Sequence, residues 1–131
     1  MQGIKYFDFE FKQQIERNIL TALLMSDRAY DVLNKIWNGE KQTTDTLQAL
    51  FDNNFYAEAF VELWNMYKKG EKVDPVTLKD KLSNEYDEVT LSDIMNIMRD
   101  SNSQSADVRT VMLNGYALLG MYWEGEEVEE A

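Results

Sequence analysis

The chain has 131 residues with 24 acidic and 13 basic side chains, so its formal net charge at pH 7 is −11. It has no histidine and no cysteine, which excludes disulfides, thiolate and imidazole metal sites, cysteine nucleophiles and serine–histidine catalytic pairs. The negative charge disfavours direct binding to nucleic acid or to anionic membrane surfaces, because both are held through clustered Lys and Arg.

Apolar side chains recur at intervals of three and four along the chain, and this spacing predicts helices rather than strands. A long amphipathic helix is predicted from Phe11 to about Ser26. Ser26 and Asp27 offer an N-cap for a second helix, which is predicted to end at Gly39 with the glycine in a left-handed conformation. No apolar run approaches the roughly 20 residues that a membrane-spanning helix needs, and we expect a cytoplasmic protein.

The middle of the chain is predicted to contain a short helix and a longer one. The polar segment 40–46 is expected to be a loop, in which Thr44 or Asp45 starts the short helix. A stripe of aromatic and aliphatic side chains predicts the longer helix over residues 55–69. Gly70 follows two lysines and is expected to end it, because glycine and basic side chains both favour a helix C-terminus.

Two start signals mark the next two helices. Asp74 precedes Pro75, which combines an N-cap residue with a first-turn proline and predicts a helix that runs to about Tyr86. Thr90 is followed three residues later by Asp93, which resembles a capping box and predicts the start of another helix. The buried face of that helix is expected to contain Leu91, Ile94, Met95 and Met98.

The final helix is predicted over residues 105–123, and we expect Gly115 and Gly120 to let another helix approach it closely. Residues 124–131 include five Glu and no basic side chain, so we expect an acidic, flexible tail there. Residues 1–123 are expected to form a single domain. The predicted fold is therefore all-α, a compact bundle of six or seven helices with a longer C-terminal helix.

Three patterns resemble chemical sites, and each has a simpler structural interpretation. Gly115 and Gly120 have the spacing of a P-loop, but Met121 and Tyr122 stand where Lys and Ser or Thr are required. The segment 100–105 lacks the central Gly of a calcium loop. Carboxylate pairs at helical spacing lack the His of a di-iron site, and no general base is visible for a hydrolase. We therefore expect no catalytic residue, no metal, no cofactor and no enzymatic activity.

Two blocks of sequence resemble the N-terminal domain of DnaB-type replicative helicases, and the resemblance extends over about residues 12–123. The first block is IERNILTALLMSDRAYDVL, residues 15–33, and the second is FDNNFYAEAFVELWNMYKKGEKVDPVTLKDKL, residues 51–82. Thirteen residues carry the resemblance and are expected to support the fold: Glu16, Leu20, Leu23, Leu24, Tyr30, Phe51, Phe60, Gly70, Val73, Asp74, Thr77, Leu78 and Leu82.

The resemblance implies a protein-interaction module. In such helicases this domain pairs and assembles into a collar above a hexameric ATPase ring, and the collar receives primase and, in some systems, loader proteins. The ATPase motor lies downstream in the family, and these 131 residues contain no P-loop. We therefore expect either a domain of a longer helicase or a stand-alone relative encoded by a phage or mobile element.

The final helix is expected to mediate self-association, as a homodimer or higher oligomer, through its apolar side chains. The residues assigned to this interface are Val108, Met112, Leu119, Tyr122 and Trp123. The remaining surface would dock primase, a helicase loader or the helicase motor domain. An alternative is a stand-alone acidic protein that modulates a host replication protein, with its charge of −11 mimicking DNA.

Overall fold

A computed structural model describes residues 9–83 and 88–130, and in the last helix it describes side chains as far as Tyr122. The described residues are helical and include no strand, which confirms the predicted all-α class. The helices are α1 (Phe9–Met25), α2 (Asp27–Ile36), the 3₁₀ helix η2 (Gly39–Lys41), α3 (Thr44–Gln48), α4 (Asn54–Lys68), α5 (Pro75–Ser83), α6 (Leu91–Arg99) and α7 (Val108–Glu130).

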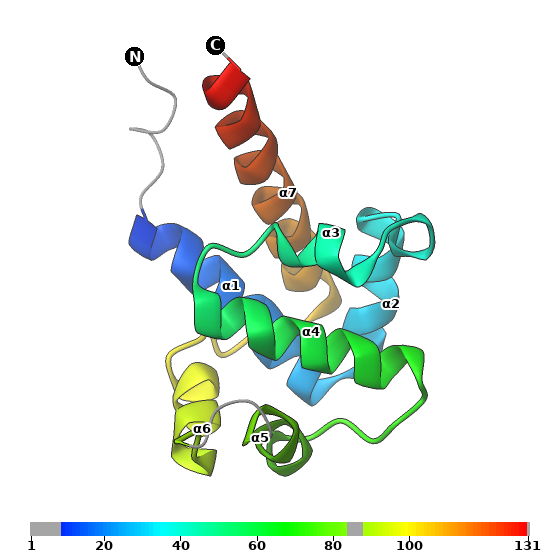
Figure 1. Ribbon diagram of the computed structural model, residues 1–131, viewed down its shortest axis with the longest axis vertical. Coiled ribbons are helices and arrows are strands. Elements are labelled where there is room, and N and C mark those ends of the chain that lie inside the picture. Colours follow the sequence, from blue (N-terminus) through cyan, green and yellow to red (C-terminus); the bar gives the residue numbers. More distant parts are fainter. Residues whose placement is uncertain (1–8, 84–87, 131) are drawn as a thin grey trace.

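Helix α1 runs through the middle of the bundle and contacts α2, α4, α6 and α7. Figure 1 shows α4 crossing in front of α1, with α3 beside it, while α5 and α6 lie together at one end of the molecule. Helix α7 packs against α1 and α2, and its C-terminal half extends past the other helices at the opposite end (Figure 1). The bundle therefore leaves part of its longest helix outside the core.

The core is formed mainly by α1 and α4, whose inward faces are almost completely buried. Its largest fully buried side chains are Trp64, Phe60, Ile19, Leu20, Leu23, Leu33, Leu63, Met66, Leu78, Leu82, Ile94 and Leu118. Burying one such side chain stabilises the fold by roughly 1.5–3 kcal/mol. Among the described residues, no helix is both long enough and apolar enough to cross a membrane.

Three of the predicted helix signals are confirmed in atomic detail. Gly70 has φ of +69°, the left-handed conformation that ends α4. The backbone N–H of Thr77 donates to Asp74 Oδ1 at 2.8 Å and caps α5. Thr90 and Asp93 form the capping box at the start of α6, with each side chain accepting from the other's backbone N–H.

The prediction that Gly39 ends the second helix in a left-handed conformation is wrong. Asn38 has the positive φ, 55°, and Asn is one of the few residues with a side chain that tolerates it. Gly39 is buried and starts η2 instead. A Cβ atom at Gly39 would lie 2.1 Å from Asn34 Oδ1 and 3.2 Å from the Trp64 ring, so a larger residue there would displace the Asn34 side chain and crowd Trp64.

The predicted buried face of α6 is wrong at two positions. Leu91 and Met95 are 40% and 47% exposed, whereas Ile94 and Ile97 are buried. The short α6 contacts α1 and α5, and the face that packs against them carries Ile94 and Ile97. Residues three apart share a helix face, so Ile97 takes the place that was expected for Met95.

The last helix differs from the prediction at both ends. It begins at Val108 rather than near residue 105, and its backbone continues past Trp123 to Glu130. The division into a domain at 1–123 and a flexible tail at 124–131 therefore stays a prediction. The expected end of α5 near Tyr86 lies outside the described residues.

Candidate functional site

The first half of α7 packs closely against α2 around Gly115. Trp37 Nε1 donates to the backbone oxygen of Gly115 at 3.0 Å. A Cβ atom at Gly115 would lie 2.8 Å from Leu33 Cδ2, so a larger residue would push the two helices apart. The prediction that Gly115 lets another helix approach is confirmed. At Gly120 a Cβ atom would meet nothing within 4 Å among the described residues, so none of them approaches closely there.

The loop before α7 is positioned by the buried side chain of Asn18. The Oδ1 atom of Asn18 accepts from the backbone N–H of Asn102 at 2.8 Å and from Ser105 Oγ at 3.4 Å. Ser105 is itself buried. Asn18 thus connects α1 to the loop that sets where α7 begins.

Helix α7 carries apolar side chains on two opposite faces. Val111 and Leu118 are fully buried toward α1 and α2. On the other side Met112, Leu113 and Tyr116 are 41%, 66% and 57% exposed. Their spacing of three and four residues places them on one side of the helix, and we call these three residues the α7 apolar face.

A surface hollow of about 800 Å³ lies along this face. It is lined by Gln104, Asp107, Val108, Arg109, Thr110, Met112, Leu113 and Tyr116. The hollow therefore combines the loop before α7 with the exposed side of the helix. The exposed apolar side chains in this hollow suit contact with another protein.

The five residues assigned to the interface from sequence lie in different surroundings. Val108 and Met112 line the hollow. Leu119 and Tyr122 are half-buried and pack against the core, and the side chain of Trp123 lies outside the described part of the chain. Sequence reasoning missed Leu113 and Tyr116, although their spacing from Met112 follows the same helical period.

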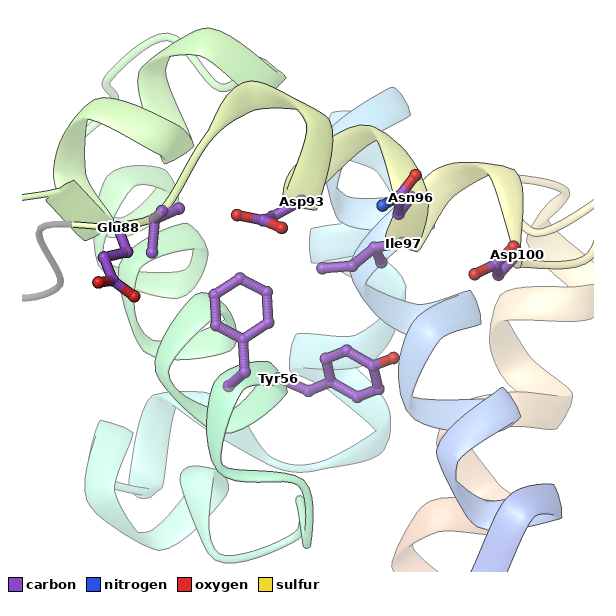
Figure 2. A pocket seen from close by; sticks show the side chains of 8 residues that line it. Tyr56, Glu88, Asp93, Asn96, Ile97 and Asp100 are labelled. Carbon is purple, nitrogen blue, oxygen red and sulfur yellow. The ribbon is translucent and has the colours of Figure 1, made fainter.

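A second depression, which we call the α4/α6 groove, lies between the start of α4 and the length of α6. Its volume is about 430 Å³, and it is lined by Phe55, Tyr56, Glu88, Val89, Asp93, Asn96, Ile97 and Asp100. Figure 2 shows Asp93, Asn96, Ile97 and Asp100 following one another along α6, with Glu88 at one end and Tyr56 on the facing helix. Sequence reasoning did not find this groove.

Among the residues that carried the resemblance, Glu16 has the most polar environment despite being fully buried. Its Oε2 atom accepts from Lys12 Nζ at 3.0 Å and from the backbone N–H of Asp52 at 3.0 Å. Its Oε1 atom accepts from the backbone N–H of Asn53 at 3.2 Å. These bonds tie α1 to the turn before α4, so Glu16 has a structural role and does not face the surface.

The other twelve residues that carried the resemblance lie mostly in or against the core. The buried ones are Leu20, Leu23, Leu24, Phe51, Phe60, Leu78 and Leu82, the half-buried ones are Tyr30, Val73, Asp74 and Thr77, and only Gly70 of this set is exposed. Tyr30 lies in an aromatic cluster, with its ring stacked on Tyr67 at 4.9 Å between centroids and tilted against Trp64 at 4.6 Å. This set therefore stabilises the helical frame rather than forming a site.

The aromatic cluster contains one strongly perturbed hydroxyl. Tyr67 Oη donates to the backbone oxygen of Leu23. Burial, and then the carboxylates of Asp27 and Asp31, raise the pKa of Tyr67 to about 12. A hydroxyl with such a high pKa remains protonated near neutral pH, which makes it a poor base, and its role is structural.

The described residues contain no cluster of three acidic side chains that could hold a metal ion. Two surface features could contact other molecules, the α7 apolar face and the α4/α6 groove. Both are built on helices that the core holds in place.

Residues 9–112 match the family described as DnaB-like helicase N terminal domain, and the chain therefore belongs to this family. The matched range includes α1 to α6 and the beginning of α7, and it contains both blocks that carried the resemblance. The family is a non-catalytic domain of a helicase. Leu113 and Tyr116 lie beyond the matched range. No curated protein and no solved structure gives a significant match to the chain.

Proposed function

We propose that this chain is an interaction domain of a replicative DNA helicase that supports oligomerisation of the helicase into a collar. The observation that carries the proposal is the α7 apolar face, three large apolar side chains exposed on a helix whose other side is firmly packed. A rigid helix loses little conformational entropy on association, so such a face favours pairing with another helix.

Self-association must overcome the charge of the chain. Two copies with a net charge of −11 each repel one another, although salt at physiological strength screens charges beyond about 8 Å. A stable dimer usually buries about 1,200 Å² or more, which the α7 apolar face can reach only together with its surrounding hollow. Gly120 follows Tyr116 by one helical turn and has free space where a Cβ would be, so a second helix can approach closely there.

The remaining surface would dock primase, a helicase loader or the helicase motor domain. The acidic surface would reduce contact of the collar with DNA, because the phosphate backbone has the same sign of charge. No residue in this proposal performs catalysis. The domain acts by holding other proteins in place.

Sedimentation of the full chain over a concentration range tests the oligomerisation part. We expect a dimer at tens of micromolar in about 150 mM salt. Replacing two residues of the α7 apolar face, Leu113→Gln with Tyr116→Gln, should raise the dissociation constant by about tenfold or more, since hot spots are large buried apolar side chains.

A matched control is available on α6, where Leu91 and Met95 are also exposed apolar residues one turn apart. The double variant Leu91→Gln with Met95→Gln should leave the dissociation constant unchanged. A chain that remains monomeric at tens of micromolar, or a control pair that weakens association as much as the α7 pair, contradicts the proposal.

A further inference from the structure

We propose that the α4/α6 groove binds a segment of a partner protein in which an arginine or lysine is flanked by apolar side chains. The groove is separate from the α7 apolar face and uses different helices. The inference extends the interaction function proposed above to a second surface, and it can fail or succeed independently of self-association through α7.

The floor of the groove is apolar. Ile97 is almost fully buried, and the side chains of Phe55 and Val89 are half-buried and pack against the core. The volume of about 430 Å³ lies within the range of roughly 300–1,000 Å³ that small-molecule sites occupy. The groove can therefore accept one or two apolar side chains of a partner.

The rim of the groove is acidic. Glu88, Asp93 and Asp100 line it, and no lysine or arginine does. Glu88 is exposed at one end of the groove. Asp100 Oδ1 is paired with Arg99 Nε at 3.2 Å, and its second oxygen can accept another donor. A cation is the charge that this rim complements.

A metal ion is a poorer match to the same carboxylates than a basic side chain. Asp93 Oδ2 is already used in the capping box, where it accepts from the backbone N–H of Thr90 at 2.8 Å. Figure 2 shows Glu88, Asp93 and Asp100 spread along the groove instead of converging on one point. Among the described residues no set of three acidic side chains is close enough for a metal. Separated single carboxylates suit separate ammonium or guanidinium groups.

Two aromatic side chains favour a long basic residue over a compact cation. The rings of Phe55 and Tyr56 both line the groove, with centroids 6.4 Å apart. The Tyr56 hydroxyl accepts from Arg17 Nη1 at 3.3 Å. An arginine or lysine can lay its aliphatic stem on the apolar floor, while its charged end interacts with a ring or a carboxylate.

A second copy of the chain is a less suitable occupant because it brings a net charge of −11 to an acidic rim. The acidic residues 124–130 would be repelled for the same reason. Charge complementarity therefore selects a basic segment of a different protein.

The test uses the full chain labelled with ¹⁵N and a synthetic probe peptide, acetyl-Leu-Ala-Arg-Leu-Ala-Leu-amide, titrated in about 150 mM salt. Two matched peptides replace the arginine with the uncharged isostere citrulline, or all leucines with serine. We expect the first peptide to change the backbone amide chemical shifts of the protein mainly at Phe55, Tyr56 and Ile97. Both matched peptides should bind much more weakly.

Charge variants assign the binding to the groove. Glu88→Gln with Asp100→Asn should weaken binding by up to about fivefold, because the single arginine of the peptide loses its partner whichever of the two carboxylates it pairs with. The control Asp31→Asn with Glu40→Gln removes the same charge from exposed positions on α2 and η2, and should change the affinity less than about twofold. Asn96→Arg should block the peptide by filling the groove with a like charge.

Several outcomes would overturn the proposal. These are absence of shifts up to about 1 mM peptide, equal binding of the citrulline peptide, equal weakening by the control pair, and shifts scattered over the acidic surface. Shifts of Phe55 and Ile97 that depend on protein concentration without any peptide would identify a second copy as the occupant instead. Dimerisation through α7 is measured separately by sedimentation, so failure of one proposal is distinguishable from failure of the other.

Discussion

Glu16 is the residue that shows most clearly how this bundle stabilises a buried charge. Its carboxylate is fully buried, yet both oxygens accept hydrogen bonds, and the Lys12 ammonium provides the opposite charge. Lys12 Nζ also donates to the backbone oxygen of Leu50 at 2.8 Å and pairs with Asp52 at 3.2 Å. The charge pair is therefore satisfied on all sides, which a buried pair requires in order not to destabilise the fold.

We predict that Glu16→Gln lowers the free energy of unfolding by about 2 kcal/mol or more. The NH₂ group of Gln would face Lys12 or a backbone N–H group, which are themselves donors. Lys12 would also lose its closest carboxylate. Urea denaturation at pH 7 measures the change. Glu40→Gln, at an exposed position, should alter stability by less than about 0.5 kcal/mol, and a similar small loss for Glu16→Gln would contradict the structural role.

Tyr67 gives a prediction for alkaline pH. Its pKa in the folded protein is about 12, above the ordinary value of 10.0, which applies to the unfolded chain. The folded state therefore holds this proton more tightly, so the contribution of Tyr67 to stability is complete below pH 10 and is lost between pH 10 and 12.

We expect the wild-type chain to lose stability more steeply than Tyr67→Phe as the pH rises from 10 to 12. Urea midpoints of both proteins measured at intervals from pH 8 to pH 12 test this. Burial and the carboxylates of Asp31 and Glu40 also raise the pKa of Tyr30, which is present in both proteins. Parallel curves above pH 10 would show that Tyr67 ionises equally easily in the folded and unfolded states.

At the scale of elements, the two glycines of α7 determine how closely other helices can approach it, and their surroundings differ. At Gly115 there is no room for a Cβ atom, because Leu33 is fully buried and cannot move freely. At Gly120 no described residue occupies the space of a Cβ atom. The same local sequence feature therefore serves packing within the chain at one position and leaves the helix surface free at the other.

We predict that Gly115→Ala destabilises the chain by about 1–2 kcal/mol, because overpacking outweighs the higher helix propensity of Ala. Gly120→Ala should instead stabilise it by about 0.5–1 kcal/mol, because only the propensity changes. Thermal unfolding followed by circular dichroism, at a concentration where the chain is monomeric, compares the two. Changes of the same sign and size would mean that α7 does not pack closely on α2.

At the scale of the whole molecule, the net charge of −11 sets the sign of the salt dependence. Apolar pairing of two acidic copies is opposed by charge repulsion, and salt weakens that repulsion. A DNA mimic would behave oppositely, because its attraction to a basic partner is itself screened by salt.

We expect self-association to become stronger, by several-fold, when sodium chloride is raised from about 50 mM to about 500 mM. Sedimentation equilibrium at both concentrations provides the measurement. Leu113→Gln with Tyr116→Gln should remove the salt effect along with the association. Association that weakens as salt rises would indicate that charge pairs, and not the α7 apolar face, hold the copies together.

Local interactions explain which structural features were predictable from sequence. The capping box of Thr90 with Asp93 and the left-handed Gly70 depend on contacts within four residues, so sequence spacing was sufficient. The prediction for Gly39 failed because close packing on Asn34 and Trp64 determines its role. Leu91 and Met95 were wrongly predicted to be buried, because the helices that pack against α6 determine which of its side chains are buried, and the spacing within α6 does not.

The amino-acid sequence alone determined that the protein is helical, acidic, without histidine or cysteine chemistry, and similar to the N-terminal domain of DnaB-type helicases. Only the tertiary structure decided which face of α7 remains exposed and that Phe55 and Ile97 meet across a groove. The physical reason is the separation along the chain of the residues that interact. Helices and their caps follow from neighbouring residues, whereas faces and grooves depend on side chains that folding brings together from distant parts of the chain.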